Sequence, residues 1–395
     1  MASSIFNIHA DFKKSKNSFI FDKNNNKFYL DFFGLYSTNV LGYENKYFNN
    51  KKNNQIILDN FFFKFPTCEV STDQTIKFNK NFIKKTNISK NFDYVNFFST
   101  GALAIESAIK ASMYFKNFKQ KIISFDNSFH GINSYGGIIS DRKLSKKRLS
   151  NFPGNYFKQF KPYYNTQFHK NEIDIDTSFN LIEKEFEDNH KDICCCIIEP
   201  IQCTAGDLYV DIKYLEKLRN LTKKFKIPLI FDEIQTGFFT SKKIWYFEEI
   251  NIIPDILVFG KKSQVSGIAI NKKFSKIRNN TFMLDVTYNS DHLDMIRSNF
   301  ILNFIIDRNL LKSRNSISEY LHKKLHKIKF IKNLRSSGSL LAFDLANKKL
   351  RDNIYKKLYK KGVLVNISGS KTIRIRLNLL TSKSECNYFL KQMSI

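Results

Sequence analysis

The chain has no long apolar segment. Over 395 residues, no apolar run approaches the roughly 18 residues that a membrane-spanning helix needs. The first residues, Met1-Ala-Ser-Ser-Ile-Phe6, have no basic stretch followed by a long apolar one, and no arginine occurs before Arg142. This pattern predicts neither a secretory signal nor an arginine-rich transit peptide. We therefore expect a cytoplasmic protein without a membrane partner.

Cysteine pairs with metal-site spacing are also missing. Of the six cysteines, Cys194, Cys195 and Cys196 are consecutive in an apolar stretch, and the other three are scattered. No CxxC motif is repeated, so the sequence predicts neither a zinc site nor a disulfide framework. We expect these side chains to be small buried hydrophobic groups and expect no metal.

Acidic residues are scarce relative to basic ones. The 36 Asp and Glu stand against 64 Lys and Arg, a formal net charge of +28. Such a charge is compatible with nucleic-acid binding through phosphate contacts. A second interpretation is compositional bias, because the abundant Lys, Asn, Ile, Phe and Tyr share A/T-rich codons. Since the lysines are spread along the chain, we favour the bias and expect no specific nucleic-acid partner.

Three apolar stretches each end at a charged residue. Residues 256–259 lead through a glycine to Lys261, residues 194–198 lead to Glu199, and residues 228–231 lead to Asp232. In an open parallel sheet, ligands bind beyond the carboxyl ends of the strands. A lysine and an aspartate that meet there suggest a pyridoxal phosphate site, with the lysine for the Schiff base and the carboxylate for the pyridinium nitrogen.

Two further segments fit such a site, although each has an ordinary explanation. A predicted strand at 93–98 enters Ser99-Thr100-Gly101-Ala102 and a helix at about 103–115, whose amino end could hold a phosphate or could simply be capped. After a strand at 121–125, Phe129 could stack on a flat cofactor or could pack on the core. The alternation of strands and helices predicts right-handed crossovers and a mainly parallel sheet.

The ends of the chain are expected to form a smaller domain. Residues 19–21 and 27–30 form a predicted hairpin, and residues 340–344, 363–365 and 372–376 are predicted strands. We expect an arm and part of the small domain in residues 1–50, a large cofactor domain in residues 51–290, and a small α+β domain in residues 291–395.

The motifs occur in an order that resembles the class III aminotransferases of fold type I. They are Ser-Thr-Gly-Ala before a helix, Phe-His-Gly, Glu-Pro, Asp232-Glu-Ile-Gln-Thr-Gly237 and Gly260-Lys261. The stretch from Phe259 to Gly267, Phe-Gly-Lys-Lys-Ser-Gln-Val-Ser-Gly, is most similar to the L-lysine 6-aminotransferase branch. The resemblance implies an α/β fold with a mainly parallel seven-stranded sheet flanked by helices, and pyridoxal 5'-phosphate as cofactor.

The resemblance also implies roles for single residues. Lys261 would form the Schiff base and move the proton, and Asp232 would hold the protonated pyridine nitrogen. Gln235 would contact the phenolic oxygen, and Phe129 would stack on the ring. The remaining implied contacts are the backbone of Gly101 and Ala102 on the phosphate, Thr287 from a partner subunit on the same phosphate, and Arg374 on the substrate α-carboxylate.

Two positions depart from the family pattern in the substrate site. Thr204 stands where relatives have a glutamate that acts as a gate, and Ile132 stands where the lysine branch has an arginine. We therefore expect the cofactor chemistry to be retained and the substrate preference to be altered.

The expected activity is a ping-pong transfer of a terminal amino group, from L-lysine to 2-oxoglutarate, by a homodimer with shared active sites. Two alternatives are open at this point. One is another class III ω-aminotransferase, acting on ornithine, a diamine or 4-aminobutyrate. The other is a non-catalytic relative that binds the cofactor.

Overall fold

The structure is a computed structural model that describes residues 6–43, 46–141, 156–279 and 283–393. The first five residues, which belong to the stretch used above to argue against a secretory signal, lie outside the described part. The chain divides into two compact units, residues 63–302 and residues 1–62 with 303–395. These limits lie about 12 residues after the expected ones. Within the described residues, no helix combines the length and apolar character that crossing a bilayer requires.

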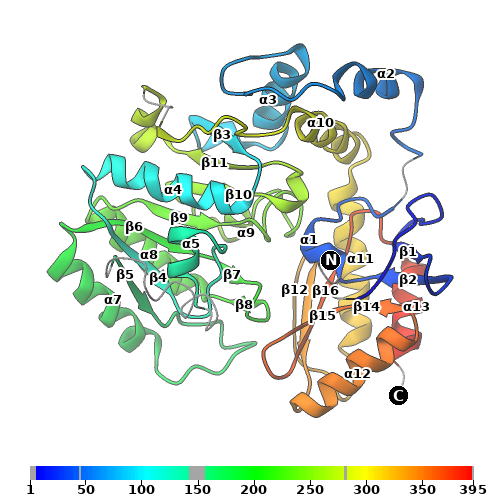
Figure 1. Cartoon of the computed structure of the whole chain (residues 1–395). Helices are drawn as coiled ribbons and strands as arrows, with labels where there is room; N and C mark the ends of the chain where they lie inside the picture. Colours follow the sequence, from blue (N-terminus) through cyan, green and yellow to red (C-terminus); the bar gives the residue numbers. More distant parts are fainter. Residues whose placement is uncertain (1–5, 44–45, 142–155, 280–282, 394–395) are drawn as a thin grey trace. The chain divides into compact units, whose positions relative to one another are not determined.

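The unit of residues 63–302 is built around a seven-stranded sheet with the order β3-β11-β10-β9-β6-β4-β5 (Figure 1). Five strands, β10, β9, β6, β4 and β5, are parallel to their neighbours in that order, whereas β11 is antiparallel to both β10 and β3. The prediction of a mainly parallel sheet is confirmed. In sequence order, the strands are β3 (Tyr94–Phe98), β4 (Lys121–Phe125), β5 (Phe157–Phe160), β6 (Ile193–Ile198), β9 (Leu229–Asp232), β10 (Ile256–Phe259) and β11 (Ser266–Ile270).

The central strands are apolar on both faces because both faces are covered. Every residue of β6, β9 and β10 is buried, including the three consecutive cysteines of β6. Helix α4 (Gly101–Phe115) contacts β6, β10 and β11 with a side rich in alanine. The small side chains of Ala104, Ala108 and Ala111 are fully buried there and let the helix approach the sheet closely.

Three long helices of this unit begin at polar caps. Thr100, Asp174 and Asp211 accept hydrogen bonds from backbone N–H groups in the first turns of α4, α7 and α8, as capping residues do. The remaining elements are α3 (Asp73–Lys85), η1 (Ile88–Lys90), α5 (Ser134–Ile139), α7 (Ile175–Asn189), β7 (Ile201–Gln202), β8 (Leu208–Tyr209), α8 (Ile212–Lys224), α9 (Tyr246–Ile250), η2 (Lys261–Ser263) and η3 (Lys272–Asn279); α10 (His292–Asp307) crosses the division between the units.

The antiparallel strand β11 depends on a glycine at its second position. A Cβ atom on Gly267 would lie 2.4 Å from Cζ of Phe259 and 2.6 Å from the backbone oxygen of Asn96. Phe259 is on β10 and Asn96 on β3, so β11 lies tightly between its two neighbours at this point. No larger residue fits there without moving a strand.

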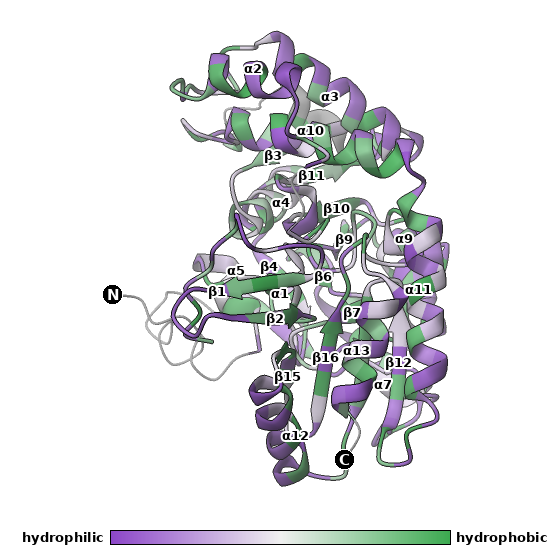
Figure 2. Ribbon diagram, turned by 90° about the vertical axis from the view of Figure 1, so that its right-hand side faces the viewer, coloured by the Kyte–Doolittle hydropathy of each residue, from purple (hydrophilic) through white to green (hydrophobic). Residues whose placement is uncertain are grey.

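The other unit holds two small sheets, with the orders β1-β2-β14 and β12-β13-β16-β15. The predicted hairpin and the three predicted strands near the carboxyl end are present. The residues of helix α12 are mostly hydrophilic (Figure 2). The elements are β1 (Phe19–Asp22), β2 (Lys27–Asp31), α1 (Gly34–Ser37), α2 (Lys51–Asn60), α11 (Leu310–Leu325), β12 (Lys332–Ser337), β13 (Leu340–Asp344), α12 (Lys348–Lys360), β14 (Val363–Leu364), β15 (Asn366–Ser368), β16 (Thr372–Arg376) and α13 (Lys383–Met393).

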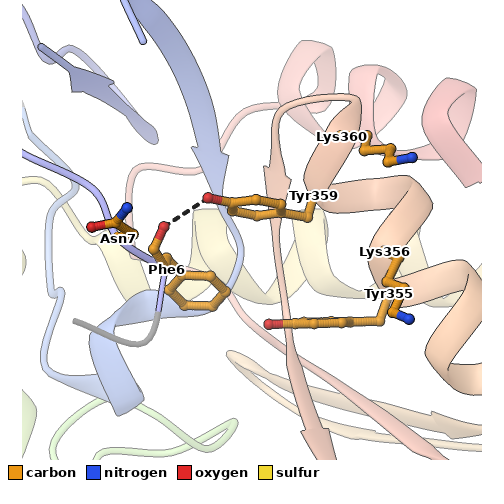
Figure 3. A pocket seen from close by; sticks show the side chains of 6 residues that line it. All are labelled: Phe6, Asn7, Tyr355, Lys356, Tyr359 and Lys360. Atoms are coloured by element: carbon orange, nitrogen blue, oxygen red, sulfur yellow. Dashed lines mark hydrogen bonds between the residues drawn. The ribbon is translucent and has the colours of Figure 1, made fainter. Parts of the chain in front are cut away.

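Two surface features belong to this second unit. The start of the described chain lies against α12, where the hydroxyl of Tyr359 donates a 2.7 Å hydrogen bond to the backbone oxygen of Phe6, beside an open pocket (Figure 3). Helix α2 buries none of its residues. Leu58, Phe61 and Phe62, on α2 and just after it, are exposed, and Phe62 keeps 85% of its surface accessible.

Candidate active site

The carboxyl ends of four parallel strands open into one cavity of about 290 Å³. The register places Val258 of β10 opposite Asp232 of β9, and Phe231 of β9 opposite Ile198 of β6, so these strands end close to one level. The residues that follow them therefore converge. The cavity is lined by Gly101, Ala102, Phe129, His130, Gly131, Ile132, Glu199, Asp232, Ile234, Gln235 and Lys261.

Asp232 is a buried carboxyl group of this cavity with a partner on each oxygen. Its side chain is 4% exposed, and its Oδ2 lies 2.9 Å from Nδ1 of His130, whose side chain is fully buried. Its Oδ1 accepts a hydrogen bond of 3.1 Å from the backbone N–H of Ile234. Each carboxylate oxygen thus has a partner within the protein, which fixes the orientation of the group at the end of β9.

His130 is a contact that the sequence analysis did not assign. The Phe-His-Gly triplet was recognised, but only the phenylalanine received a role. His130 belongs to the loop after β4, and its Nε2 is buried without a hydrogen-bond partner in the described structure. A histidine directly beside a proposed stacking residue, in a loop at the carboxyl end of a strand, was the available signal.

Glu199 lies at the end of β6 in the same cavity. It is 4% exposed, and its Oε1 accepts a 2.7 Å hydrogen bond from the backbone N–H of Phe129. Burial, and after it the nearby negative charge of Asp232, raises the pKa of the Glu199 carboxyl well above its usual value. Glu199 therefore connects the loop that carries Phe129 to the strand ends.

Lys261 and Lys262 occupy different environments. The strand stops at Phe259, and the chain turns into η2 with Lys261 at φ 55°, a left-handed conformation that non-glycine residues seldom adopt. Lys261 is partly exposed and lines the cavity, whereas Lys262 is 1% exposed and is not among the lining residues. The short turn, rather than a continued strand, separates the two side chains.

The amino end of α4 forms another part of the cavity wall. Gly101 and Ala102 are the first two residues of the helix, so their N–H groups have no partner within the helical ladder. A Cβ atom on Gly101 would lie 2.8 Å from Cδ1 of Ile234, which shows how closely the helix start approaches the segment after Asp232. This end carries the positive pole of the helix dipole, as a phosphate site requires.

Some of the other expected site residues line the cavity and others do not. Gln235 lines the cavity, and its Nε2 donates a 3.3 Å hydrogen bond to Oγ1 of Thr204. Ile132 also lines it and is 75% exposed. Thr287 is exposed and is not a lining residue, and Arg374 is a buried residue of β16 in the other unit, paired with Ala342 and Asn366.

These groups fit pyridoxal phosphate. The helix start offers N–H donors for a phosphate, and the buried carboxylate of Asp232 suits a ring nitrogen that carries a proton. The amine of Lys261 suits an aldehyde, and the side chains of Phe129 and Ile234 offer apolar surface for the ring. Fold and cavity together fit a pyridoxal-phosphate-dependent enzyme of fold type I.

Comparison with known proteins identifies the family. The family described as "Aminotransferase class-III" matches residues 1–395, so the chain belongs to the class III aminotransferases, which depend on pyridoxal phosphate. The L-lysine-epsilon aminotransferase of Mycobacterium tuberculosis is 27% identical over 317 residues, which are 73% of this chain and 69% of that protein. The 4-aminobutyrate aminotransferase of Kluyveromyces lactis is 26% identical over 428 residues, which cover 96% and 88% of the two chains.

Solved structures agree on the fold. The structure entitled "Lysine aminotransferase from M. tuberculosis in the internal aldimine form" aligns with a TM-score of 0.92 at 23% identity, covering 100% of this chain and 95% of that one. An S-selective transaminase from Arthrobacter sp. aligns with a TM-score of 0.81 at 21% identity, covering 98% and 91%. The resemblance to class III aminotransferases, the fold class, the enzyme class and the cofactor predicted from the sequence are confirmed.

Proposed function

We propose that the protein transfers a terminal amino group from L-lysine to 2-oxoglutarate. The observation that carries the proposal is the convergence of Lys261, Asp232 and the start of α4 on one cavity of a class III aminotransferase. The choice of lysine is supported by the similarity to the mycobacterial L-lysine-epsilon aminotransferases. The reaction is ping-pong, because donor and acceptor use the same cavity one after the other.

The residues of the cavity divide the chemistry between them. Bound pyridoxal phosphate supplies an electron sink for the carbon that bears the transferred nitrogen. Asp232 stabilises positive charge at the ring nitrogen, since an adjacent carboxylate favours the charged form. Lys261, once its amine is released, takes a proton from the substrate carbon and returns one to the cofactor side. Gln235 orients the phenolic oxygen, and Phe129 covers one ring face.

We assign the binding of the substrate α-carboxylate to an arginine side chain. Arg374 offers a planar fork for the α-carboxylate of the donor and of 2-oxoglutarate. Ile132, exposed and apolar at the cavity rim, offers no charge to the distal carboxylate of 2-oxoglutarate. Thr204 bonds to Gln235 and has no charge to cover an arginine. We therefore propose that this enzyme binds 2-oxoglutarate with lower affinity than a variant with arginine at position 132 would.

The working unit in this proposal is a homodimer with shared active sites. Thr287 is exposed, as a residue that reaches the phosphate of a partner subunit has to be. The exposed apolar group at and after α2, formed by Leu58, Phe61 and Phe62, is the kind of surface that subunit contacts cover. Five of the six cysteines are buried and none of the six forms a disulfide, which fits the reducing cytoplasm that we propose as its location.

A 4-aminobutyrate activity is the second candidate. The Kluyveromyces lactis 4-aminobutyrate aminotransferase aligns over 96% of this chain, more than the mycobacterial relative does. A donor screen separates the two candidates: purified protein with pyridoxal phosphate is mixed with L-lysine, L-ornithine, 4-aminobutyrate or a diamine, and the cofactor spectrum is followed. We expect the fastest spectral change with L-lysine. Faster conversion with 4-aminobutyrate would replace the lysine assignment, and no change with any donor would contradict a transaminase function.

A further inference from the structure

Two buried carboxyl groups share the active-site cavity. Asp232 ends β9 and Glu199 follows β6, and these strands are neighbours in the sheet. The side chain of Asp232 has His130 on one oxygen and the N–H of Ile234 on the other. Glu199 accepts from the N–H of Phe129. Cofactor chemistry needs the negative charge of Asp232, but it assigns nothing to Glu199.

We propose that Glu199 is a positioning residue that works as a neutral acid. Its carboxyl oxygen holds the backbone of Phe129 at the cavity wall, and its bound proton keeps the negative charge of the pair on Asp232. The neutral state of Glu199 does not depend on the proposed reaction. Only its effect on cofactor binding rests on the proposed function.

The charges around Glu199 support a neutral state. Asp232 is the facing anion, and two carboxylates buried this deeply repel each other strongly when both are ionised. Lys261 is the facing cation, and it favours an ionised Glu199, as do the backbone N–H groups of Phe129 and Cys203. Burial and Asp232 outweigh these groups, in agreement with the raised pKa of the carboxyl. Condensation of the Lys261 amine with the cofactor would remove one of the groups that favour ionisation.

A neutral Glu199 also explains the division of hydrogen bonds in the cavity. Asp232 takes the histidine contact, which suits an ionised acceptor. Glu199 accepts from neutral backbone N–H groups, that of Phe129 at 2.7 Å among them, which a carboxylic acid can do while it keeps its proton. The glutamine side chain has the same shape and keeps the accepting oxygen, so Glu199→Gln mimics the neutral acid, whereas Glu199→Ala removes the acceptor.

Infrared difference spectroscopy tests the charge state directly. The full chain is measured at neutral pH, with and without added pyridoxal phosphate, against Glu199→Gln. We expect the wild-type protein to show the carbonyl stretch of a protonated carboxyl that the variant lacks. The control is Glu172→Gln, because Glu172 is an exposed carboxylate paired with Lys161, and its loss should remove carboxylate bands instead. A loss of carboxylate bands in Glu199→Gln would overturn the proposal.

Stability against pH gives a second readout that does not need the cofactor. A carboxyl whose pKa is raised on folding stabilises the folded state below the unfolded pKa, and this stability is lost as the pH rises toward the folded pKa. The unfolding equilibrium constant of the wild-type protein should therefore rise with pH, relative to Glu199→Gln, by up to about tenfold per pH unit above about 4.5. The pKa of Glu172 is lowered by its hydrogen bond with Lys161, so the comparison with Glu172→Gln should show the opposite deviation, and only below about pH 4.5.

Cofactor binding tests the positioning role. Loss of a hydrogen bond that holds Phe129 should make Glu199→Ala bind pyridoxal phosphate about five- to tenfold more weakly than Glu199→Gln. Equal affinities of the two variants would overturn the positioning role. If no variant and no wild-type sample binds the cofactor, the proposed function fails, while the infrared result still decides whether Glu199 is neutral.

Discussion

The ion pair of Arg219 and Asp255 offers a quantitative test of how the site is supported. Asp255 precedes β10, and its two oxygens accept from both terminal nitrogens of Arg219, at 2.6 and 2.9 Å. The same carboxylate accepts from the backbone N–H of Leu229, at 3.0 Å, and from the side chain of Asn271, at 2.8 Å. It therefore connects the beginnings of β9, which ends at Asp232, and β10, which leads to Lys261.

Replacement of Arg219 by methionine keeps most of the volume and leaves a buried negative charge behind. Arg219 is 9% exposed and Asp255 is 2% exposed, so water cannot replace the guanidinium. Breaking a buried pair in this way costs roughly 3–5 kcal/mol. Because Asp255 keeps two neutral donors, we expect a loss of about 3 kcal/mol in the free energy of unfolding, measured by urea titration.

Two further variants make the reasoning refutable. Arg219→Met combined with Asp255→Asn removes the orphaned charge and should recover at least about 1 kcal/mol relative to the single variant. Lys217 lies on the same helix, α8, but its pair with Asp176 is exposed, so Lys217→Met should cost less than about 0.5 kcal/mol. A cost below about 1 kcal/mol for Arg219→Met, or a double variant less stable than the single one, would refute the account.

Four other predictions concern the reaction. Lys261→Ala should abolish turnover and the visible absorbance of the covalently held cofactor, whereas Lys262→Met should keep both; the reverse result would exchange their roles. Asp232→Ala should lower kcat by orders of magnitude while Lys261 still binds the cofactor covalently, and a stability loss with normal kcat would make it a structural residue. Thr287→Val should weaken cofactor retention, measured by dialysis, without unfolding the protein, and an active monomer in light scattering would contradict its role across subunits. Ile132→Arg should lower the KM for 2-oxoglutarate by about ten- to a hundredfold, the value of about 1.5–3 kcal/mol for a charged hydrogen bond, and an unchanged KM would refute the account of the rim.

The strand ends could be predicted because their sequences leave few alternatives. Short, continuous apolar runs that stop at a charged residue indicate strands buried on both faces, and β6, β9 and β10 lie within one residue of the predicted bounds. The order of the charged residues along the chain then places them at one edge of the sheet. The start of α4 was less accurate, by two residues, because capping by Thr100 fixes it more than the apolar pattern does.

Other features depend on contacts between distant segments. Nothing local in Ser266–Ile270 indicates that this strand runs antiparallel between β3 and β10. The bond between His130 and Asp232 joins residues 102 positions apart, and the bond between Gln235 and Thr204 joins residues 31 positions apart. The turn at Lys261 was also missed, since its left-handed backbone is imposed by the strand end and not by its own side chain.

Gly267 sets a limit on how far the composition of this protein can drift. The chain is rich in residues with A/T-rich codons and holds only 14 glycines, whose codons begin with two guanines. A change at either of the first two bases of this codon replaces the glycine, and any other residue brings a Cβ atom, which would meet Phe259 at 2.4 Å and Asn96 at 2.6 Å. Replacements of Gly267 should therefore be removed by selection, whereas replacements at exposed positions should be tolerated. In a lineage under that mutational pressure, the glycine between these two strands should be retained while the lysine count around it continues to change.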